Sequence, residues 1–158
     1  MLLIRNAMLY TMEDGAVPQQ GDILMDGGKI RAAGRDLPAQ GAEVLDASGL
    51  TATPGLIDAH SHVGGFAMEG ADLNEITDPV TAHLCAIDAI DIHCDAFKAL
   101  HTFGITAACF VPGSANVVCG TGFVAKTAGA NTVGDLAVLN PAVMKCALGG
   151  NPKGYGKK

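Results

Sequence analysis

The sequence contains no tryptophan, and aromatic side chains of all kinds make up 4% of its 158 residues. Its uninterrupted apolar runs are far too short to span a bilayer, which excludes a membrane-spanning helix. The N-terminal segment carries Arg5 within its apolar part and lacks the basic start and small-residue cleavage site of a signal peptide. We therefore expect a cytoplasmic protein with no membrane partner.

Basic residues are also scarce. Ten Lys and Arg residues stand against sixteen Asp and Glu residues, giving a formal net charge of −6, and the only adjacent basic pair is Lys157 and Lys158. Proteins that bind nucleic acid neutralise phosphates with clustered Lys and Arg side chains. We therefore expect no nucleic-acid partner.

Closely spaced cysteines are absent as well. The chain has five cysteines, an odd number, and none forms a C-x-x-C pair. This spacing argues against a zinc knuckle or a redox dithiol. We expect reduced thiols, mostly buried, because a free cysteine behaves as a small apolar residue. The five are Cys85, Cys94, Cys109, Cys119 and Cys146.

Short strands separated by turns dominate residues 1–53. Asp26, Gly27 and Gly28 separate two extended segments and supply the positive φ angles of a tight hairpin. Ser48-Gly49 and Pro54-Gly55 mark two further turns. The mixture of apolar and polar residues predicts a small β unit with one covered face.

Residues 54–158 have a different organisation. An apolar segment ends at His62, and a Gly-rich and acidic stretch from Gly64 to Leu84 follows as a predicted loop. Apolar residues then recur at helical spacing between Ala86 and Phe103, and Gly104 ends that helix. "ITAACFV", residues 105–111, reads as a buried strand, so the order is that of a parallel β-α-β unit. "AVMKCAL", residues 142–148, predicts another strand.

His60 and His62 are the candidate metal ligands. Alternate residues of a strand share a face, which places the two imidazoles together with Cα atoms roughly 6.5–7 Å apart. Both rings can reach one cation at about 2.0–2.1 Å from each nitrogen. Asp58 lies on the same face and would orient a ligand or hold a water. On spacing alone, two hydrogen-bonded histidines without a metal remain an open alternative.

Four segments resemble the metal-dependent amidohydrolase superfamily, in particular its imidazolonepropionase-like branch. They are "DILMDGGKIRAAG", "VLDASGLTATPGLIDAHSHV", "NEITDPVTAHLCAIDAID" and "VPGSANVVCGTG". The resemblance implies an α/β fold with an all-β N-terminal part. Residues 1–53 would form a small β-sandwich segment, and residues 54–158 the first strands and helix of an incomplete (β/α)8 TIM-type barrel.

The same resemblance implies hydrolysis of the carbon–nitrogen bond of a small-molecule substrate, an amide, a cyclic amide or a dipeptide-like compound. A divalent metal, zinc by preference, would activate the attacking water. Family members use further ligands from later barrel strands, including a carboxylate or a carboxylated lysine. Lys145 and Lys153 are the candidates for that lysine, although each also reads as a solvated side chain. In "ALGGNPK" the residue before the Asn is Gly150, where the family has an acid, so this segment is a weak source of ligands.

A complete barrel takes about 250 residues, more than the whole chain. We therefore expect the isolated chain to be a poor enzyme that needs a partner, either the remainder of the barrel or a second copy of itself. The acidic residues Glu69, Asp72, Glu75 and Asp78 slightly favour a cationic or neutral substrate.

Two other functions compete with this one. The first is a non-catalytic remnant or an interaction subunit that retains His60 and His62 by inheritance. "GTGFVAKT", residues 120–127, approaches a phosphate-binding loop but has Ala125 where the second glycine belongs. The remaining histidines are expected to be solvated or locally hydrogen-bonded. They are His83, His93 and His101.

Overall fold

The computed structural model describes residues 1–66 and 73–154. The chain divides into two compact units, Met1–Pro54 and Gly55–Lys158. Within the described residues, no helix is both long enough and apolar enough to cross a membrane.

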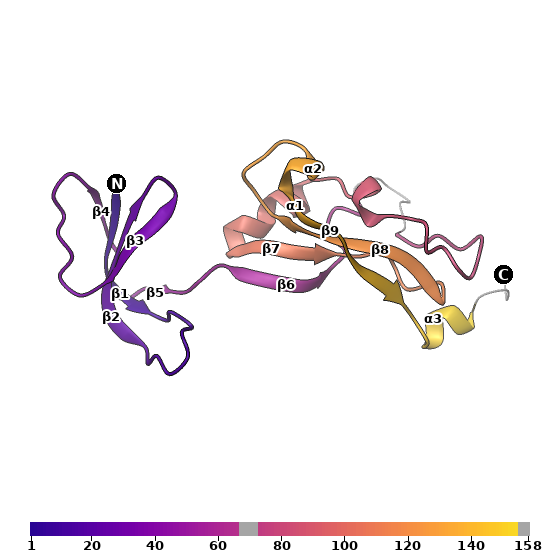
Figure 1. Cartoon of the computed structure of the whole chain (residues 1–158), viewed down its shortest axis with the longest axis horizontal. Coiled ribbons are helices and arrows are strands. Elements are labelled where there is room, and N and C mark those ends of the chain that lie inside the picture. The colour runs from indigo at the N-terminus through magenta and orange to yellow at the C-terminus, as the bar shows by residue number, and fades with distance from the viewer. Residues whose placement is uncertain (67–72, 155–158) are drawn as a thin grey trace. The chain divides into compact units, whose positions relative to one another are not determined.

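The first unit contains a five-stranded mixed sheet (Figure 1). Its hydrogen-bonded order is β3-β2-β1-β4, and β5 also pairs with β1. Strands β1, β2 and β3 are antiparallel neighbours, whereas β4 and β5 run parallel to β1. The strands are β1 (Leu2–Leu9), β2 (Gln19–Asp26), β3 (Lys29–Gly34), β4 (Glu43–Asp46) and β5 (Thr51–Ala52).

The β2–β3 hairpin confirms the predicted turn. Asp26 pairs with Lys29, and the two residues between them, Gly27 and Gly28, have φ angles of 56° and 72°. Both angles lie in the left-handed region that a two-residue hairpin loop needs and that glycine adopts without a Cβ penalty. The turn at Ser48-Gly49 is confirmed in the same way, with a φ of 79° at Gly49.

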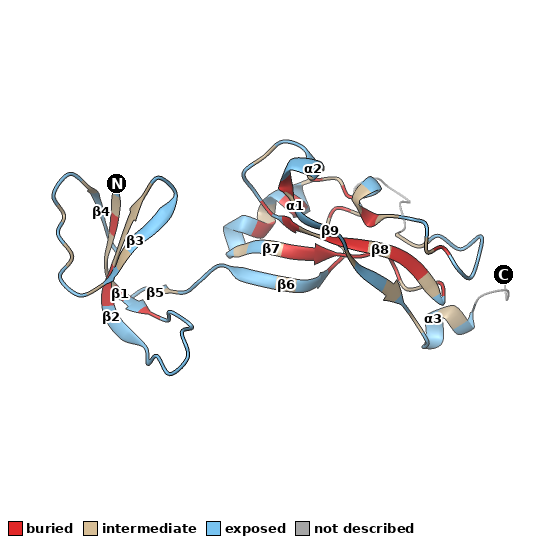
Figure 2. Ribbon diagram, viewed as in Figure 1, coloured by how far each residue is buried: buried red, intermediate tan, exposed pale blue. Residues whose placement is uncertain are grey.

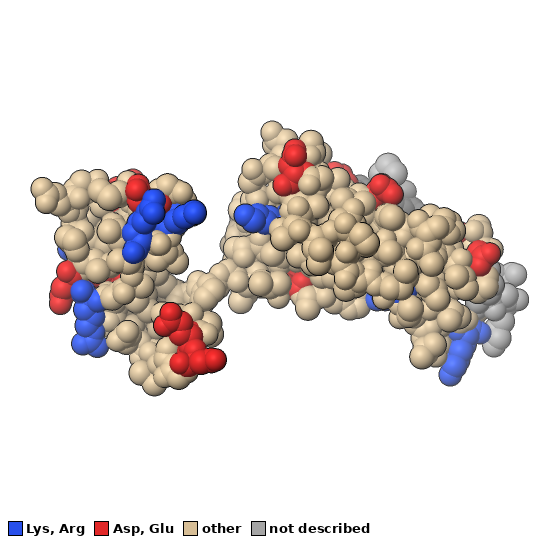
Figure 3. Space-filling view, viewed as in Figure 1, with Lys and Arg blue, Asp and Glu red and all other residues tan. Residues whose placement is uncertain are grey.

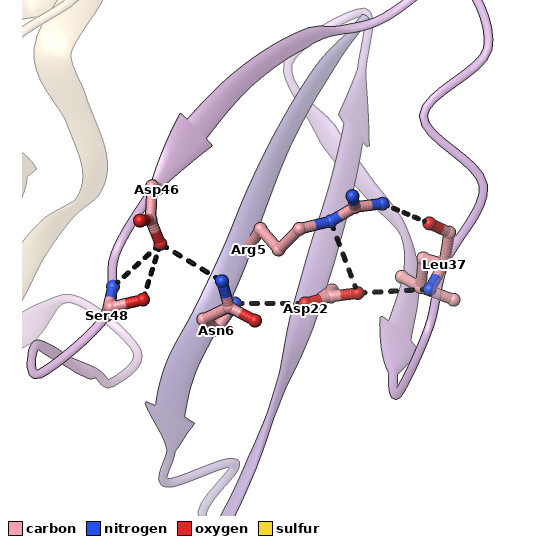
Figure 4. Close-up of polar contacts among 6 residues, drawn as sticks. All are labelled: Arg5, Asn6, Asp22, Leu37, Asp46 and Ser48. Atoms are coloured by element: carbon pink, nitrogen blue, oxygen red, sulfur yellow. Dashed lines mark hydrogen bonds and ion pairs between the residues drawn. The ribbon is translucent and has the colours of Figure 1, made fainter.

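A buried carboxylate ties β1, β2 and the segment after β3 together. Asn6 lies where the β1–β2 register shifts, at a φ of 65°, and its N–H donates to Asp22 Oδ1 at 3.0 Å. Asp22 Oδ2 accepts the Leu37 N–H at 3.0 Å, and the Arg5 guanidinium lies 3.9 Å away while donating to the Leu37 carbonyl (Figure 4). The Asp22 side chain is almost fully buried and has its acceptors satisfied, as a buried charge requires.

A second carboxylate, Asp46, organises the turn that leaves β4. Its Oδ1 accepts the Ser48 hydroxyl at 2.6 Å and the Asn6 side-chain amide at 3.1 Å (Figure 4). The Ser48 hydroxyl, followed by Asn6, lowers the pKa of Asp46 below its ordinary value, because both donors stabilise the charged form.

The second unit contains a four-stranded sheet in the order β6-β7-β8-β9. Strands β6 and β7 are parallel and are joined by a helical crossover, which confirms the predicted β-α-β unit. Strands β7, β8 and β9 are antiparallel neighbours. The strands are β6 (Leu56–Ser61), β7 (Ile105–Phe110), β8 (Val118–Lys126) and β9 (Ala137–Cys146). The helices are η1 (Ala86–Asp88), α1 (Asp95–Ala99), η2 (Leu100–Phe103), α2 (Val133–Leu136) and α3 (Gly150–Lys153), where η denotes a 3-10 helix.

The core of this unit is a row of three stacked phenylalanines. Phe110 of β7 lies between Phe97 of α1 and Phe123 of β8, with ring centroids 5.4 Å apart on each side. All three are buried, and Leu100 and Leu136 join the same apolar cluster from η2 and α2. Burial is concentrated on β7 and β8, whereas β6 and β9, the two outer strands, are mostly exposed (Figure 2).

The predicted continuous helix from Ala86 to Phe103 is wrong in its middle. Asp91 Oδ1 accepts the His93 N–H at 2.7 Å, a local side-chain bond that competes with helical pairing, and α1 begins only at Asp95. The predicted end is confirmed, because Gly104 caps η2 with a φ of 79°.

The described strands form no closed barrel. A (β/α)8 barrel is all parallel, but only seven residues, 111–117, separate the end of β7 at Phe110 from the start of β8 at Val118. Such a connection is too short for a parallel crossover, so β8 must run antiparallel. The predicted strand at residues 142–148 is confirmed in part, since β9 begins earlier and ends at Cys146.

We predict that Phe110→Ala destabilises the second unit by about 3–5 kcal/mol, because it removes the central ring of the stack and leaves a cavity. Urea unfolding followed by circular dichroism measures this change. Phe103→Ala is the control, with an expected change of about 0.5 kcal/mol or less, since its side chain is 75% exposed. Equal destabilisation by the two variants would contradict the central role of Phe110.

We predict that Asp22→Asn destabilises the first unit by about 1–3 kcal/mol, because the amide cannot accept both backbone N–H groups with its two terminal atoms. Faster amide hydrogen exchange at Asn6 and Leu37 is the measurement. The exposed Asp14→Asn is the matched control and should leave both exchange rates unchanged. Unaltered exchange in Asp22→Asn would show that the carboxylate is dispensable.

Candidate metal centre

The predicted ligands lie at the C-terminal end of β6. His60 belongs to the strand and His62 follows its last residue, Ser61. The two rings are side by side, with centroids 5.0 Å apart in an edge-to-face arrangement. His60 is exposed and His62 is half-buried. The structure therefore brings the two imidazoles together on one side of the strand end, as the alternation predicts.

The neighbouring strand fixes the orientation of His62. Its Nδ1 lies 2.9 Å from the Val111 carbonyl oxygen, and the Val111 N–H donates to the Ser61 carbonyl at 3.1 Å. Because a carbonyl only accepts, Nδ1 must carry the proton. The neutral ring then has a lone pair on Nε2, the tautomer and orientation of a histidine prepared to bind a metal.

Lys145 contacts His60 from the far edge of the sheet. Its Nζ lies 2.9 Å from His60 Nε2, although 85 residues separate the two in sequence. An ammonium group only donates, so His60 Nε2 accepts and the imidazole is neutral. The positive charge of Lys145 is the main cause that lowers the pKa of His60, followed by burial and His62, while Asp58 acts in the opposite direction.

Asp58 supports the strand end through the main chain. Its Oδ1 accepts the backbone N–H of His60 at 3.0 Å. The carboxylate is half-buried. Burial raises the pKa of the Cys109 thiol, and the negative charge of Asp58 raises it further. Asp58 therefore contacts the main chain of His60, and its predicted support of a ligand ring or a water stays a prediction.

The other candidate residues lie elsewhere. His83, His93 and His101 are exposed, and Lys153 is an exposed residue of α3. Within residues 1–66 and 73–154, no three His, Cys, Asp or Glu side chains are grouped closely enough to hold a metal ion. Within the described part of the chain, the His60–His62 pair therefore has no third ligand of these types beside it.

Part of the acidic loop and the phosphate-loop alternative can also be placed. Glu75 and Asp78 are exposed, whereas Glu69 and Asp72 lie outside the described residues. The Thr77 side chain and N–H lower the pKa of Glu75 by hydrogen bonding to it. Residues 120–126 belong to β8, so the nucleotide-binding reading is wrong, because a phosphate loop must leave the strand and enter a helix.

The five cysteines are free thiols, but the expectation that most of them are buried is wrong, since only two of the five are. Cys109 and Cys119 are buried, Cys85 and Cys94 are half-buried, and Cys146 is exposed. On the face shown in Figure 3, charged side chains are dispersed over the second unit rather than gathered in a patch.

The donor set fits part of a zinc centre. The Nε2 lone pair of His62 is available to a metal, because the ring proton lies on Nδ1. The Nε2 lone pair of His60 accepts a hydrogen bond from Lys145, and a metal or loss of the lysine charge would break that bond. Two neutral imidazoles are ligands that zinc prefers, but a catalytic zinc site usually has three protein ligands. Lys145 is the described lysine that contacts this pair, through His60 Nε2.

Known proteins resemble this chain over a limited part of their own length. The chain is 31% identical over 147 residues to the amidohydrolase tasK of Hapsidospora irregularis, covering 80% of this chain and 15% of that protein. It is 43% identical over 61 residues to a dihydroorotase of Lactobacillus leichmannii, covering 39% of this chain and 14% of the relative. No protein-family model matches the chain.

A crystal structure of an amidohydrolase from Thermotoga maritima MSB8 superimposes on nearly the whole chain. The TM-score is 0.86 at 36% identity, over 99% of this chain and 42% of that one. The chain is a relative of the amidohydrolase superfamily, and it corresponds to part of larger proteins.

Two features of this site carry no local sequence signal. The Val111 carbonyl is a main-chain group whose role depends on the β6–β7 pairing. The Lys145–His60 contact depends on the position of β9 in the sheet, and a lysine in an apolar strand is only a weak indication of it.

We predict that Lys145→Gln raises the pKa of His60 towards its ordinary value, because the variant removes the main cause of the lowering. Histidine ring resonances followed by NMR across a pH titration measure the shift. The exposed Lys153→Gln is the control and should leave the titration unchanged. An identical His60 titration in Lys145→Gln and the unaltered protein would contradict the contact.

The lowered pKa of His60 also determines whether the second unit gains or loses stability as the pH falls. A folded-state pKa below the unfolded value means that the unfolded chain binds the extra proton first as the pH falls. The second unit should therefore lose some stability as the pH drops through the ordinary range of histidine, and Lys145→Gln should reduce that loss. The effect is small, since His60 is exposed and its charge is screened.

Proposed function

We propose that this chain supplies the first ligands of an amidohydrolase metal centre that hydrolyses a carbon–nitrogen bond. His60 and His62 bind the metal, Asp58 supports them, and Lys145 completes the part of the site that this chain contains. The observation that carries the proposal is the convergence of both imidazoles and the lysine amine at one strand end, with His60 Nε2 and Lys145 Nζ in contact at 2.9 Å.

The role assigned to Lys145 rests on its chemistry. A free lysine is an ammonium group and cannot bind a cation, but its neutral amine can add carbon dioxide to form a carbamate and release a proton. The carbamate oxygens are anionic donors suited to a divalent ion. The neighbouring imidazole of His60 is held neutral, and its Nε2 contacts the lysine nitrogen at 2.9 Å.

The chemistry of the metal follows general principles. A bound zinc ion provides a water of lowered pKa and polarises the scissile carbonyl. The chain's own contribution is orientation: Val111 holds the His62 ring in the required tautomer, and the Asp58 contact fixes the backbone of His60. Both ligands must be neutral to bind, so metal affinity should weaken in acid.

The relevant branch is the imidazolonepropionase-like one. The segments that support it are the "PGLIDAHSHV" strand end and the "VPGSANVVCGTG" segment that passes from β7 into β8. A small-molecule amide, cyclic amide or dipeptide-like compound is the proposed substrate class, with a cationic or neutral one favoured by the exposed Glu75 and Asp78.

Completion of the site requires more protein than this chain contains. The chain matches 42% of the Thermotoga amidohydrolase, and β6 and β9 are outer strands of the described sheet. Their apolar side chains are largely exposed, including Ile57 at 73% and Val138 at 63%. We propose that the remainder of a (β/α)8 barrel, or a second copy of this chain, covers this surface, since exposed strand edges and apolar faces favour association.

The second candidate is a non-catalytic remnant or interaction subunit. Two observations support it. The described residues contain no complete group of metal ligands, and the chain matches less than half of the length of each relative. In that case the exposed apolar strands bind a partner, and His60 and His62 have no catalytic role.

We predict that the purified protein, together with any chain that co-purifies, contains zinc, and that His60→Ala lowers its zinc affinity by at least about tenfold. Elemental analysis and zinc titration calorimetry measure content and affinity. His93→Ala is the matched control, because His93 is exposed and bonded to Asp91 through its backbone. Absence of zinc from the unaltered protein, or equal affinity in His60→Ala, would overturn the metal centre.

The two candidate functions are separated by activity. Hydrolysis of an amide and cyclic-amide panel by the zinc-loaded assembly, abolished in His60→Ala, supports the enzyme. If the zinc-loaded assembly hydrolyses none of these compounds, the result supports the interaction-subunit hypothesis.

A further inference from the structure

A cavity adjoins the candidate metal centre on the side of the helical crossover. Its volume is about 370 Å³, at the small end of the range of ligand-binding pockets. The described residues that line it are His62, Val63, Gly64, Phe66, Cys94 and Ala96. One wall is thus the turn that follows β6, and the other is the start of α1.

The two walls are held together by the backbone. The Asp91 N–H donates to the Gly64 carbonyl at 2.9 Å, and the Gly65 N–H closes the turn on the His62 carbonyl at 3.1 Å. Gly64 has a φ of 88°, and a Cβ there would lie 2.8 Å from the Ile90 side chain and 2.9 Å from the Asp91 carbonyl oxygen. Only glycine allows this close approach, so the turn and the crossover are fixed relative to each other.

The lining is apolar and uncharged. The described lining residues include no Asp, Glu, Lys or Arg, and the His62 ring is their one strongly polar side chain. Phe66 is 59% exposed and offers an aromatic face, while Cys94 and Ala96 are small and leave space. The described lining favours an apolar group, because it offers apolar contact and gives a charged group no partner.

We propose that this cavity is a subsite for an apolar side group of the substrate, aliphatic or aromatic, with Phe66, Cys94 and Ala96 determining specificity. The inference rests on the proposed function, since His62 is both a wall of the cavity and a ligand of the proposed metal centre. Continuity through that one residue argues for the occupant: a group in the cavity lies against His62, and the bond to be hydrolysed must lie near the metal that His62 binds. The favoured substrate therefore carries an apolar side group close to its scissile carbon–nitrogen bond.

A matched pair of probes tests the subsite without any turnover. N-acetyl-L-phenylalaninamide and N-acetylglycinamide have the same polar frame and differ in the apolar group. Titrated into the full chain, the phenylalanine probe should shift the methyl resonances of Val63 and Ala96 in NMR spectra. It should do so at concentrations at least about tenfold lower than the glycine probe, as expected for burial of an aromatic side group. Equal effects of the two probes, or no shift with either, would overturn the subsite.

Ala96→Phe fills the cavity, and Lys98→Phe places the same ring on the same helix at a position that does not line it. Both residues are exposed, so both variants should fold. Ala96→Phe should lose the preference for the phenylalanine probe, as read from the Val63 methyls, and Lys98→Phe should keep it. A preference that survives in Ala96→Phe would place the binding elsewhere.

Zinc titration of the same samples separates failure of the subsite from failure of the metal centre. Selective probe binding by a chain that does not bind zinc would contradict the proposed function while supporting the cavity as an apolar binding site. Zinc binding without probe selectivity would overturn the subsite and leave the metal centre standing.

Discussion

The stacking of Phe110 between Phe97 and Phe123 is the interaction on which the second unit depends. It joins the crossover helix, β7 and β8 in one apolar layer, and its central ring belongs to the last residue of β7. The next residue, Val111, accepts the His62 ring N–H and donates to Ser61. The orientation of a candidate ligand is therefore set by a main-chain group that the aromatic core holds in place.

The site is assembled from the ends of strands that are distant in sequence. β6 contributes His60, and His62 follows its last residue. The residue after β7 fixes His62, and β9 brings Lys145 to His60. A positive charge in contact with His60 keeps that imidazole neutral, which is the state required of a metal ligand. The turn that carries His62 also forms a wall of the adjoining cavity. The position of the candidate ligand and the shape of the proposed subsite would therefore both depend on this turn.

Local chemistry accounts for the parts of the fold that sequence reasoning predicted correctly. Gly27 and Gly28 form the hairpin, Gly104 ends the crossover helix, and the apolar run after it is a strand parallel to β6. The predicted helix from Ala86 was too long. The spacing of apolar residues does not reveal that the Asp91 side chain takes the His93 N–H away from helical hydrogen bonding. The antiparallel course of β8 and β9 was missed because a family barrel implies parallel strands, whereas the short connection after Phe110 permits only the reverse.

The sequence by itself determined that His60 and His62 share a strand face, since that follows from the two-residue period of any strand. It also determined the turns, because glycine alone adopts their backbone angles at low cost. Only the tertiary structure decided that Lys145, rather than Lys153 or another histidine, lies against His60. The reason is that strand order and register set which residues meet across a sheet, and these depend on contacts between segments that no local pattern encodes.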